Sequence, residues 1–425
     1  MKENIIKHLK RRQFIDALTS DELMKRADKP LKFYIGFDPT AESLHLGNLV
    51  GIVALTWFQK FGHTPVVLLG GATGKIGDPS GKSTERPVLT KELLKHNVSS
   101  IKKQLENFLD FDHPSAKPLV LNNDDWFSKI SFTDFLRDVG KQFRIGVMLG
   151  KESVRARIQS KEGMSFTEFS YQTLQAYDFY HLYKEHDVCL QIGGSDQWGN
   201  ITAGMDYTKK ETGDSVFGMT FPLLTSSDGK KFGKSEGGAL WLSQDLCSPY
   251  KFYQYLFRVA DADVINLLKM LTFMDIEEIE ELEKQIDEGT LPPNTAQKKL
   301  AEEVTRFVHK EKGLQTAIKV TKAASPGSTA TLDLSTLKEI KEDIPSASLE
   351  VSDVVGKKYV EVVVQAELLQ SKGEAVRLIK NGGAYLNNKK IEDPAFMLEK
   401  TDLIGGEFLL VSAGKKRRML IEVTK

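Results

Sequence analysis

The first half of the chain alternates short apolar runs with longer stretches of helical spacing. Five runs have the composition of buried strands: "LKFYIGF" (31–37), "HTPVVLLGG" (63–71), "AKPLVLNN" (116–123), "DVCLQIGG" (187–194) and "DSVFGMTFPLLT" (214–225). Apolar strands that are separated by helices are typical of a parallel sheet covered on both faces. Ligands bind such sheets beyond the carboxyl ends of the strands, so the residues that follow each run are the candidates for a site.

Beyond these strands, the residue pattern divides the chain into further segments. The stretch 124–186 has helical spacing, and we assign it as an insertion in a catalytic domain that spans 1–245. Residues 246–323 are also helical in pattern. Residues 324–350 are rich in Ser, Thr and Pro, as in a linker, and 351–425 have the mixed pattern of a small α+β domain. We therefore expect an α/β protein with three folded parts.

The charge and the cysteine content of this chain limit the classes of partner and the cellular compartment that we expect. Lys and Arg number 58, as do Asp and Glu, so we expect no DNA and no membrane partner, and any polyanion site has to be a local patch. Two cysteines, Cys189 and Cys247, are too few for a disulfide framework and fit a reducing cytoplasm. The N-terminus lacks the apolar core of a signal peptide, and no run of about 18 apolar residues predicts a membrane span.

The turn after the first run, "GFDPTAESLHLGN", places polar residues where a strand ends and a helix begins. His45 and Asn48 share one face of a helix start, and Gly47 between them leaves room for a ligand. A helix N-terminus presents unpaired N–H groups and the positive end of its dipole, which suits a phosphate. His45 and Asn48 are thus candidate donors to a phosphate that gains charge during a reaction. The alternative is an ordinary helix start with Ser43 as its cap and His45 incidental.

A glycine-rich loop, "GGATGKIGDPSGKS", follows the second run. It is not a nucleotide P-loop, because Ile76 stands where that motif requires glycine. Asp78 is a candidate to hold a cationic group, and Lys82 and Arg86 are candidates to reach an anion. The alternative is a surface loop without a ligand.

Two groups of polar residues lie around the fourth run. "GGSDQWGN" (193–200) follows it; its glycines allow close approach of the backbone, and Asp196 can bind the hydroxyls of a ribose. Before it, Tyr171, Gln175 and Asp178 lie at positions i, i+4 and i+7 of a predicted helix and form one polar stripe. Such a stripe is either the solvent face of the helix or one wall of a polar pocket.

A loop with several lysines, "DGKKFGKS" (228–235), follows the fifth run. Lysines on a mobile loop can close over a triphosphate as point charges, and the alternative is a solvated basic loop. The sequence has no His/Cys cluster with the spacing of metal ligands and no GxSxG elbow. We therefore expect no metal site formed by side chains of the protein.

The order of these motifs resembles that of the class I aminoacyl-tRNA synthetases, and their details resemble the bacterial tyrosyl-tRNA synthetases. The motifs that carry the resemblance are "YIGFDPTAESLHLGN", "GGATGKIGDPSGK", the stripe Tyr171–Gln175–Asp178, "QIGGSDQWGN" and "FPLLTSSDGKKFGKS". The resemblance covers essentially the whole chain. It implies a doubly wound, Rossmann-like catalytic domain, a helical domain facing the anticodon arm, a small RNA-binding domain, and a homodimer whose interface is the helical insertion.

The resemblance also implies roles around ATP. His45 and Asn48 match the ends of the His-Ile-Gly-His signature, which stabilises the ATP phosphates; Leu46 and Asn48 depart from it, but the amide of Asn48 is still a donor. The second signature, Lys-Met-Ser-Lys-Ser, appears as residues 231–235. The residues implied in catalysis are His45, Asn48, Thr40, Lys82, Arg86, Lys231, Lys234 and Ser235. Those implied in ATP binding are Gly36, Gly47, Gly194, Asp196, Leu223 and Leu224.

For the amino acid, the resemblance implies that Tyr34 and Asp178 contact the phenolic hydroxyl of tyrosine. Phenylalanine would leave these buried groups without a partner. The residues implied around the ammonium and carboxylate groups are Tyr171, Gln175, Asp78, Gln197 and Asp38. The implied reaction joins tyrosine to ATP as tyrosyl-adenylate, releases pyrophosphate, and passes tyrosine to the 3'-terminal adenosine of tRNA(Tyr). Mg²⁺ accompanies ATP as substrate, and no tightly bound cofactor is expected.

The C-terminal stretch "LLQSKGEAVRLIKNGGAYLNNKKI" resembles a small RNA-binding domain first described in a ribosomal protein. Basic residues are spaced along one predicted helix of this stretch, and "GKKRR" (414–418) adds four consecutive positive charges. The RNA-binding residues that we assign are Lys372, Arg377, Lys380, Lys415, Lys416, Arg417 and Arg418. The alternative is a solvated charged surface.

Two other functions compete with a tyrosine-activating ligase. A tryptophan-activating enzyme is disfavoured by Tyr34 and Asp178, since an indole offers only a donor. An RNA-binding relative with a decayed catalytic site is disfavoured by the presence of His45, Lys231 and Lys234.

Overall fold

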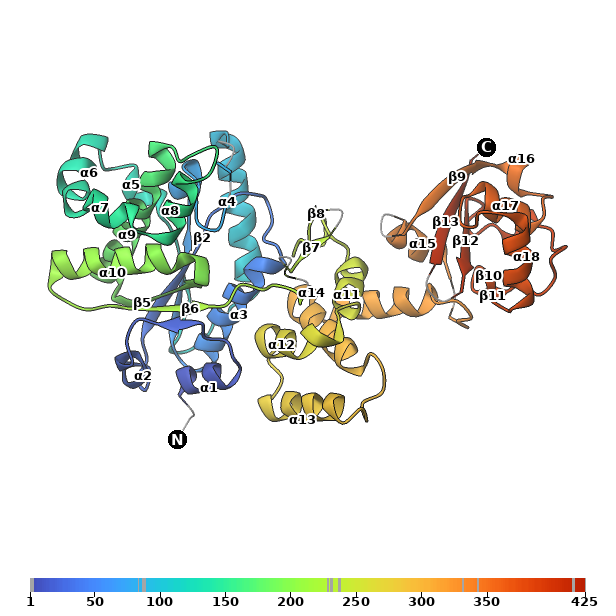
Figure 1. Cartoon of the computed structure of the whole chain (residues 1–425), viewed down its shortest axis with the longest axis horizontal. Coiled ribbons are helices and arrows are strands. Elements are labelled where there is room, and N and C mark those ends of the chain that lie inside the picture. Colours follow the sequence, from blue (N-terminus) through green and yellow to red (C-terminus); the bar gives the residue numbers. More distant parts are fainter. Residues whose placement is uncertain are drawn as a thin grey trace. The chain divides into compact units, whose positions relative to one another are not determined.

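The computed structural model describes residues 4–82, 84–85, 89–227, 229, 232–235, 238–330, 332–341, 344–414 and 417–424, with the backbone alone at 234–235. Its contacts divide the chain into two compact units, whose elements are labelled in Figure 1. The N-terminal unit comprises Met1–Leu246 and Val259–Val304, and the C-terminal unit comprises Cys247–Arg258 and Thr305–Lys425.

A six-stranded sheet forms the centre of the N-terminal unit, in the order β1-β6-β5-β2-β3-β4. Its strands are β1 (Ala17–Leu18), β2 (Lys32–Phe37), β3 (Thr64–Leu69), β4 (Leu119–Asn122), β5 (Val188–Gly194) and β6 (Phe217–Phe221). All neighbours are parallel except β1, which pairs antiparallel with β6. The five predicted strand runs contain β2 to β6, and the prediction of an α/β fold with a parallel sheet is confirmed.

The direction of strand addition reverses beside β2. From β2 the chain adds β3 and then β4 on one side, and it returns to the other side of β2 to form β5 and β6. In open α/β sheets, ligands bind in the crevice at such a reversal, outside the carboxyl ends of the strands. The topology therefore points to the ends of β2 and β5.

Helices pack on both faces of this sheet, as the side chains of β2 illustrate. Phe33 packs against Phe58 of α3, with ring centroids 4.6 Å apart, whereas Tyr34 packs against Phe179 of α9, at 5.3 Å. A strand that is covered on both sides has to be apolar at successive positions, which explains the run that predicted it. The helices of 4 to 212 are α1 (Ile5–Arg11), α2 (Glu22–Arg26), α3 (Leu46–Lys60), α4 (Lys91–Glu106), α5 (Asp124–Phe127), α6 (Phe132–Asp138), α7 (Ile145–Leu149), α8 (Glu152–Ile158), α9 (Phe166–His186) and α10 (Trp198–Thr212).

A buried arginine joins the start of the chain to the helices α12 (Asp261–Leu271) and α13 (Ile276–Asp287). The guanidinium of Arg12 lies 5.0 Å from the ring centre of Trp57 in α3. It also donates hydrogen bonds to four backbone carbonyls near the end of α12, those of Leu268, Lys269, Thr272 and Met274. Because the last carbonyls of a helix have no partner within the helix, Arg12 satisfies groups that would otherwise be buried unpaired.

The C-terminal unit contains a five-stranded sheet in the order β11-β10-β12-β13-β9. Its strands are β9 (Ser346–Glu350), β10 (Ala384–Leu386), β11 (Lys389–Lys390), β12 (Phe408–Ala413) and β13 (Arg417–Thr424). Along β12, Leu409 and Val411 belong to one core and Phe408 and Leu410 to another, so both faces of the sheet are covered. The helices of this part are α11 (Pro249–Phe257), α15 (Leu334–Ile340), α16 (Val351–Val354), α17 (Tyr359–Gln365) and α18 (Lys372–Lys380).

The long helix α14 (Thr295–Ala323) begins in the N-terminal unit and ends in the C-terminal unit, and it leaves helical geometry at Lys310. We predicted that 246–323 form a separate helical domain, whereas the two compact units share this stretch between them. The division of the chain into four parts stays a prediction.

The prediction of a linker over 324–350 is wrong for part of that segment. Residues 334–340 form α15, whose Leu337 and Ile340 are fully buried, and residues 346–350 form β9, which pairs with β13. The Ser, Thr and Pro content concealed an apolar spacing that is sufficient for one amphipathic helix.

No helix among the described residues combines the length and the apolar content needed to cross a membrane.

Candidate active site

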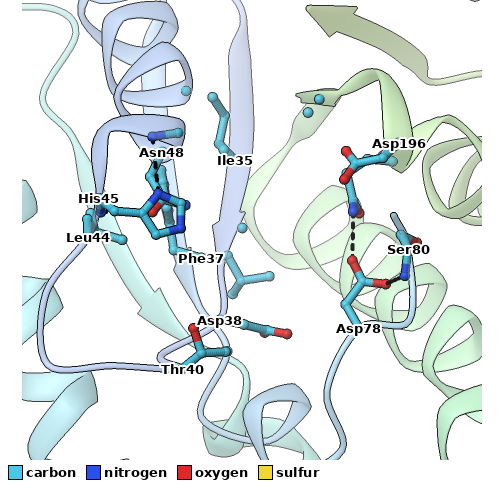
Figure 2. Close-up of a pocket in the computed structure, with 18 of the residues that line it drawn as sticks. Ile35, Phe37, Asp38, Thr40, Leu44, His45, Asn48, Asp78, Ser80 and Asp196 are labelled. Atoms are coloured by element: carbon cyan, nitrogen blue, oxygen red, sulfur yellow. Dashed lines mark hydrogen bonds between the residues drawn. The ribbon is translucent and has the colours of Figure 1, made fainter. Parts of the chain in front are cut away.

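A cavity of about 420 Å³ opens at the carboxyl ends of β2 and β5, where the topology predicts a site. In Figure 2, His45 and Asn48 lie on one side of it, and Asp78, Ser80 and Asp196 lie on the other. The side chains that the sequence singled out at separate strand ends therefore face one space.

Two regions of this cavity differ in construction. We call the region around Tyr34, Asn123 and Asp178 the deep part, because Tyr34 and Asp178 are almost completely buried. We call the region around His45 and Asn48, at the start of α3, the helix-cap part.

In the deep part, the carboxyl group of Asp178 is held by two donors. Trp126 donates from Nε1 to Oδ1 at 2.9 Å, and Asn123 donates from Nδ2 to Oδ2 at 3.1 Å. The hydroxyl of Tyr34 also lies in this region and makes no hydrogen bond with any described residue. A buried hydroxyl without a partner, beside a fixed carboxyl group, forms a place for a ligand that both donates and accepts.

Burial controls the ionisation of both groups. It raises the pKa of Asp178 to about 8, and the hydrogen bonds from Asn123 and Trp126 oppose that rise. Burial and the nearby Asp178 raise the pKa of the Tyr34 hydroxyl well above its ordinary value. Tyr34 is therefore a neutral phenol near pH 7, and Asp178 gains or loses its proton within reach of physiological pH.

A second carboxylate, Asp38, lies just after β2. Tyr171 donates to its Oδ2 at 2.8 Å, and Thr73 donates to its Oδ1 at 2.8 Å. Gly70 is required here, because a Cβ atom at this position would meet Oδ1 of Asp38 at 2.1 Å. The hydrogen bonds fix Asp38 at the wall of the cavity.

A third carboxylate, Asp78, is the centre of an amide network. Gln197 donates to its Oδ2 at 2.6 Å, and the backbone N–H of Ser80 donates to its Oδ1 at 3.0 Å. Asn200 donates to Gln175 at 3.0 Å, and Gln175 in turn donates to Gln197 at 3.3 Å. Asp38, Asp78 and Asp178 thus face the cavity together with neutral amides and a fourth carboxyl group, that of Asp196, an arrangement that suits a cationic group on the ligand.

The helix-cap part is formed by the first turn of α3. His45 is the N-cap: its Nδ1 accepts from the backbone N–H of Gly47 at 3.1 Å, and its own N–H donates to Oδ1 of Asn48 at 3.1 Å. This reciprocal arrangement assigns the ring proton to Nε2 and leaves the amide nitrogen of Asn48 as a donor. The alternative in which Ser43 caps the helix is wrong, because the N-cap is His45.

The glycines around the cavity have different roles. A Cβ atom at Gly47 would meet the His45 ring at 2.9 Å, so this glycine makes room for the histidine, and it also lines the cavity. A Cβ atom at Gly194 would meet Oδ1 of Asp196 at 2.8 Å. At Gly36 it would meet nothing within 4 Å, so Gly36 leaves the end of β2 open to a ligand.

The structure brings most of the predicted residues to this one cavity. The remaining predicted residues that line it are Thr40, Lys82, Leu223 and Leu224. Lys231 and Arg86 lie outside the described residues. Lys234 and Ser235 form β7, which pairs with β8 (Gly238–Ala239), and the description includes only their backbone.

The predicted RNA-binding residues that the structure describes differ in their surroundings. Lys372 pairs with Glu361 at 2.7 Å, and Arg417 pairs with Glu374 at 3.2 Å. Arg418 is partly buried, and that burial lowers the pKa of its guanidinium. Arg377 and Lys380 are exposed on α18. Lys415 and Lys416 lie outside the described residues.

The sequence analysis missed residues that line the cavity, such as Asn123, and residues that hold its side chains, such as Trp126 and Asn200. Asn123 directly follows β4, so the rule that ligands bind at strand ends would have identified it. Trp126 and Asn200 carry no such signal, because only the tertiary packing brings them to Asp178 and Asp78.

Known families and proteins match this chain over nearly its whole length. Residues 25–324 match the family described as tRNA synthetases class I (W and Y), and residues 336–421 match the tyrosine--tRNA ligase SYY-like C-terminal domain. The tyrosine--tRNA ligase of Protochlamydia amoebophila (strain UWE25) is 54% identical over 420 residues, which cover 99% of each chain. That of Escherichia coli (strain K12 / DH10B) is 45% identical over 422 residues, which cover 98% of each chain.

A solved structure agrees with these matches. The C-terminally truncated mitochondrial tyrosyl-tRNA synthetase of Aspergillus nidulans aligns with a TM-score of 0.66 and 32% identity, over 74% of this chain and 92% of that chain.

Proposed function

Because this chain belongs to the class I tRNA synthetases for tryptophan and tyrosine, we propose that the cavity beyond β2 and β5 is its aminoacyl-adenylate site. The chain is a tyrosine--tRNA ligase: it activates L-tyrosine with ATP, releases pyrophosphate, and transfers tyrosine to the 3'-terminal adenosine of tRNA(Tyr).

The observation that carries the choice of amino acid is the fixed carboxyl group in the deep part. Asp178, oriented by Trp126 and Asn123, and the Tyr34 hydroxyl bind the phenolic hydroxyl of the substrate. Phenylalanine leaves both groups buried without a partner, and tryptophan offers only one donor to the pair.

The backbone atoms of tyrosine bind among the other carboxylates. The ammonium group lies near Asp78, Gln175 and Tyr171, where neutral amides and a carboxylate together balance one positive charge. Asp38, Thr40 and Gln197 lie nearer the carboxylate and the α-phosphate. This arrangement holds the tyrosine carboxylate in line with the phosphorus atom that it attacks.

ATP is the nucleotide substrate, and its phosphates bind at the helix-cap part. The Nε2–H of His45 and the amide of Asn48 donate to phosphate oxygens at the start of α3. The other residues that act on the phosphates are Lys82, Arg86, Lys231, Lys234 and Ser235. The adenosine part contacts Gly36, Gly47, Gly194, Asp196, Leu223 and Leu224. No side chain forms a covalent bond with the substrates, and positioned donors stabilise the charge that develops on pyrophosphate.

Mg²⁺ enters with ATP. Among the described residues, no group of three or more His, Cys, Asp or Glu side chains is arranged to hold a metal ion. When bound with ATP, the ion would be held mainly by phosphate oxygens and water, and it would neutralise phosphate charge.

A second copy of the chain covers the exposed apolar face of the insertion. Large apolar side chains are exposed along this segment, with Phe166 67% exposed. They are Phe132, Leu136, Ile145, Val147, Leu149, Ile158 and Phe166. So many exposed apolar side chains in one segment fit the two-fold interface of a homodimer. Light scattering on Phe166→Glu tests this: the variant is expected to be monomeric, whereas Leu93→Glu, at an exposed leucine of α4, remains dimeric.

The tRNA is held in part by the C-terminal unit. Arg377 and Lys380 are exposed, and within the described part of the chain neither forms an ion pair. Reversing both charges is expected to weaken tRNA binding and to reduce its dependence on salt concentration by about two counterions. Tyrosine activation serves as the control and remains unchanged.

The reaction takes place in the cytoplasm. Cys189 and Cys247 are both free thiols, which fits a reducing compartment.

Tyrosine-dependent exchange of pyrophosphate into ATP tests the function directly. Exchange with tyrosine, and far less with phenylalanine or tryptophan, is the expected result. Exchange that depends on tryptophan, or no exchange with any amino acid, would contradict the proposed function.

A further inference from the structure

The backbone on either side of His45 is paired with the segment that follows the lysine loop. The N–H of Leu46 donates to the carbonyl of Leu240, and the N–H of Leu242 donates to the carbonyl of Leu44, both at 2.8 Å. His45 and Trp241 face each other as an antiparallel bridge. The first signature is therefore connected by backbone hydrogen bonds to residues 240–242.

Those residues continue directly into the stem of the lysine loop. The N–H of Leu240 donates to the carbonyl of Gly233 at 2.9 Å, and the N–H of Phe232 donates to the carbonyl of Leu224 at 3.0 Å. Gly233 lies so close to Leu46 that a Cβ atom on it would approach the Leu46 Cβ to 3.0 Å. The backbone of the second signature thus packs against the first.

One buried hydroxyl group stabilises this junction. Ser43 Oγ donates to the carbonyl of Leu44 at 2.8 Å and accepts from the backbone N–H of Ser243 at 3.1 Å. It also accepts from Nε2 of Gln104 at 2.9 Å. A hydroxyl has one donor and two acceptor sites, so every hydrogen-bonding site of Ser43 is used.

The partner amide of Gln104 is engaged at both of its ends. While Nε2 donates to Ser43, Oε1 accepts from the backbone N–H of Leu44 at 2.9 Å. Gln104 lies on α4, which thereby contacts the junction from outside the two signatures. Neither Gln104 nor Ser43 is among the groups proposed to touch a substrate.

We propose that Ser43 and Gln104 are positioning residues. They hold the backbone of 240–242, and through it the second signature (231–235), against the first signature (45–48), so that Lys234 and His45 act on the same phosphates. The inference rests on the proposed function, because it assigns the two signatures to one set of phosphates. It concerns the step of adenylate formation and leaves tyrosine recognition, which occurs in the deep part, to other residues.

The test is a double-mutant cycle in the full-length protein. Ser43→Ala and Gln104→Met are each expected to slow adenylate formation in single turnover by about tenfold, within the range for a small misplacement of reacting groups. The tyrosine dissociation constant, measured by equilibrium dialysis, remains within twofold of wild type. Lys103→Met, an exposed position on the same helix, is the matched control and keeps the wild-type rate.

The decisive measurement repeats both substitutions in a Lys234→Ala background. If the two residues act through the lysine loop, their effect there falls to about twofold or less, because the group that they position is absent. The proposal would be overturned if the rate of adenylate formation fell tenfold in both the wild-type and the Lys234→Ala backgrounds, or if tyrosine binding were lost. Ser43 and Gln104 would then have a purely structural role. If the wild-type protein shows no tyrosine-dependent exchange, it is the proposed function that fails.

Discussion

The deep part and the helix-cap part of the cavity are constructed in different ways. In the deep part, side chains hold side chains: Trp126 and Asn123 fix the carboxyl group of Asp178, which is buried. In the helix-cap part, His45 is fixed by its own helix start and by backbone pairing with residues 240–242.

This difference suits two different tasks. Fixed and buried groups select a ligand by the hydrogen bonds that a wrong ligand would leave unmade, an effect already present when the ligand binds. Donors at a helix start stabilise charge that appears on phosphate only during the reaction. We therefore expect substitutions in the deep part to change which amino acid reacts, and substitutions in the helix-cap part to change how fast it reacts.

The largest effect is expected at His45. His45→Ala removes a positioned donor to the phosphates and should raise the barrier to adenylate formation by about 2–4 kcal/mol. Single-turnover kinetics measures the rate, and equilibrium dialysis should find tyrosine affinity nearly unchanged. His45→Asn is the control for the lost helix cap, since asparagine caps well but is too short to place the same donor. If His45→Asn reacts at the wild-type rate, His45 is only a cap.

The next effect concerns discrimination in the deep part. Asp178→Asn should reduce the preference for tyrosine over phenylalanine by about 1–3 kcal/mol, the free energy of leaving one buried polar group unpaired. The ratio of kcat/KM for the two amino acids in pyrophosphate exchange measures it. An unchanged ratio would remove Asp178 from the amino acid pocket.

A smaller effect should appear in the pH dependence of stability. The folded-state pKa of Asp178, about 8, lies above that of an unfolded aspartic acid, so the folded protein binds this proton more tightly. The protonated Asp178 therefore makes its full contribution to the free energy of unfolding at low pH, and this contribution decreases as the pH rises toward 8. Between pH 6 and 7, the free energy of unfolding of the wild type relative to Asp178→Asn should fall by about 1.4 kcal/mol. Denaturant titrations at the two pH values check this, and a difference that stays constant would contradict the raised pKa.

The smallest effect is expected at Tyr34. Its hydroxyl has no hydrogen-bond partner in the described structure, so Tyr34→Phe should change the free energy of unfolding by less than about 1 kcal/mol. Discrimination against phenylalanine should fall, but by less than in Asp178→Asn. A larger loss of discrimination than in Asp178→Asn would assign the main role to the phenol.

The sequence predicted the two regions unequally, for physical reasons. The stripe Tyr171–Gln175–Asp178 was visible because helical spacing places these residues on one face of α9. The strand ends were visible because parallel strands deliver their carboxyl ends to one edge. Trp126 and the pairing of Leu44 with Leu242 depend on contacts between distant segments, which no local pattern encodes.

Two errors of interpretation have a common origin. The alternative interpretation of the α3 start made Ser43 the cap because serine is a frequent cap, whereas the structure uses His45 there and gives Ser43 a tertiary role. Composition likewise suggested a linker where Leu337 and Ile340 form a buried helical face. In both cases a general preference of residue types was outweighed by specific packing.

One measurement tests the division between the two regions most directly: the tyrosine-to-phenylalanine ratio of kcat/KM in pyrophosphate exchange, determined side by side for the wild type, His45→Ala and Asp178→Asn. We predict that His45→Ala lowers both values by a similar factor and keeps the ratio, whereas Asp178→Asn lowers the ratio by about 5-fold to 150-fold, the equivalent of about 1–3 kcal/mol. A ratio that changes in His45→Ala as much as in Asp178→Asn would contradict the assignment of selection to the deep part and of chemistry to the helix cap.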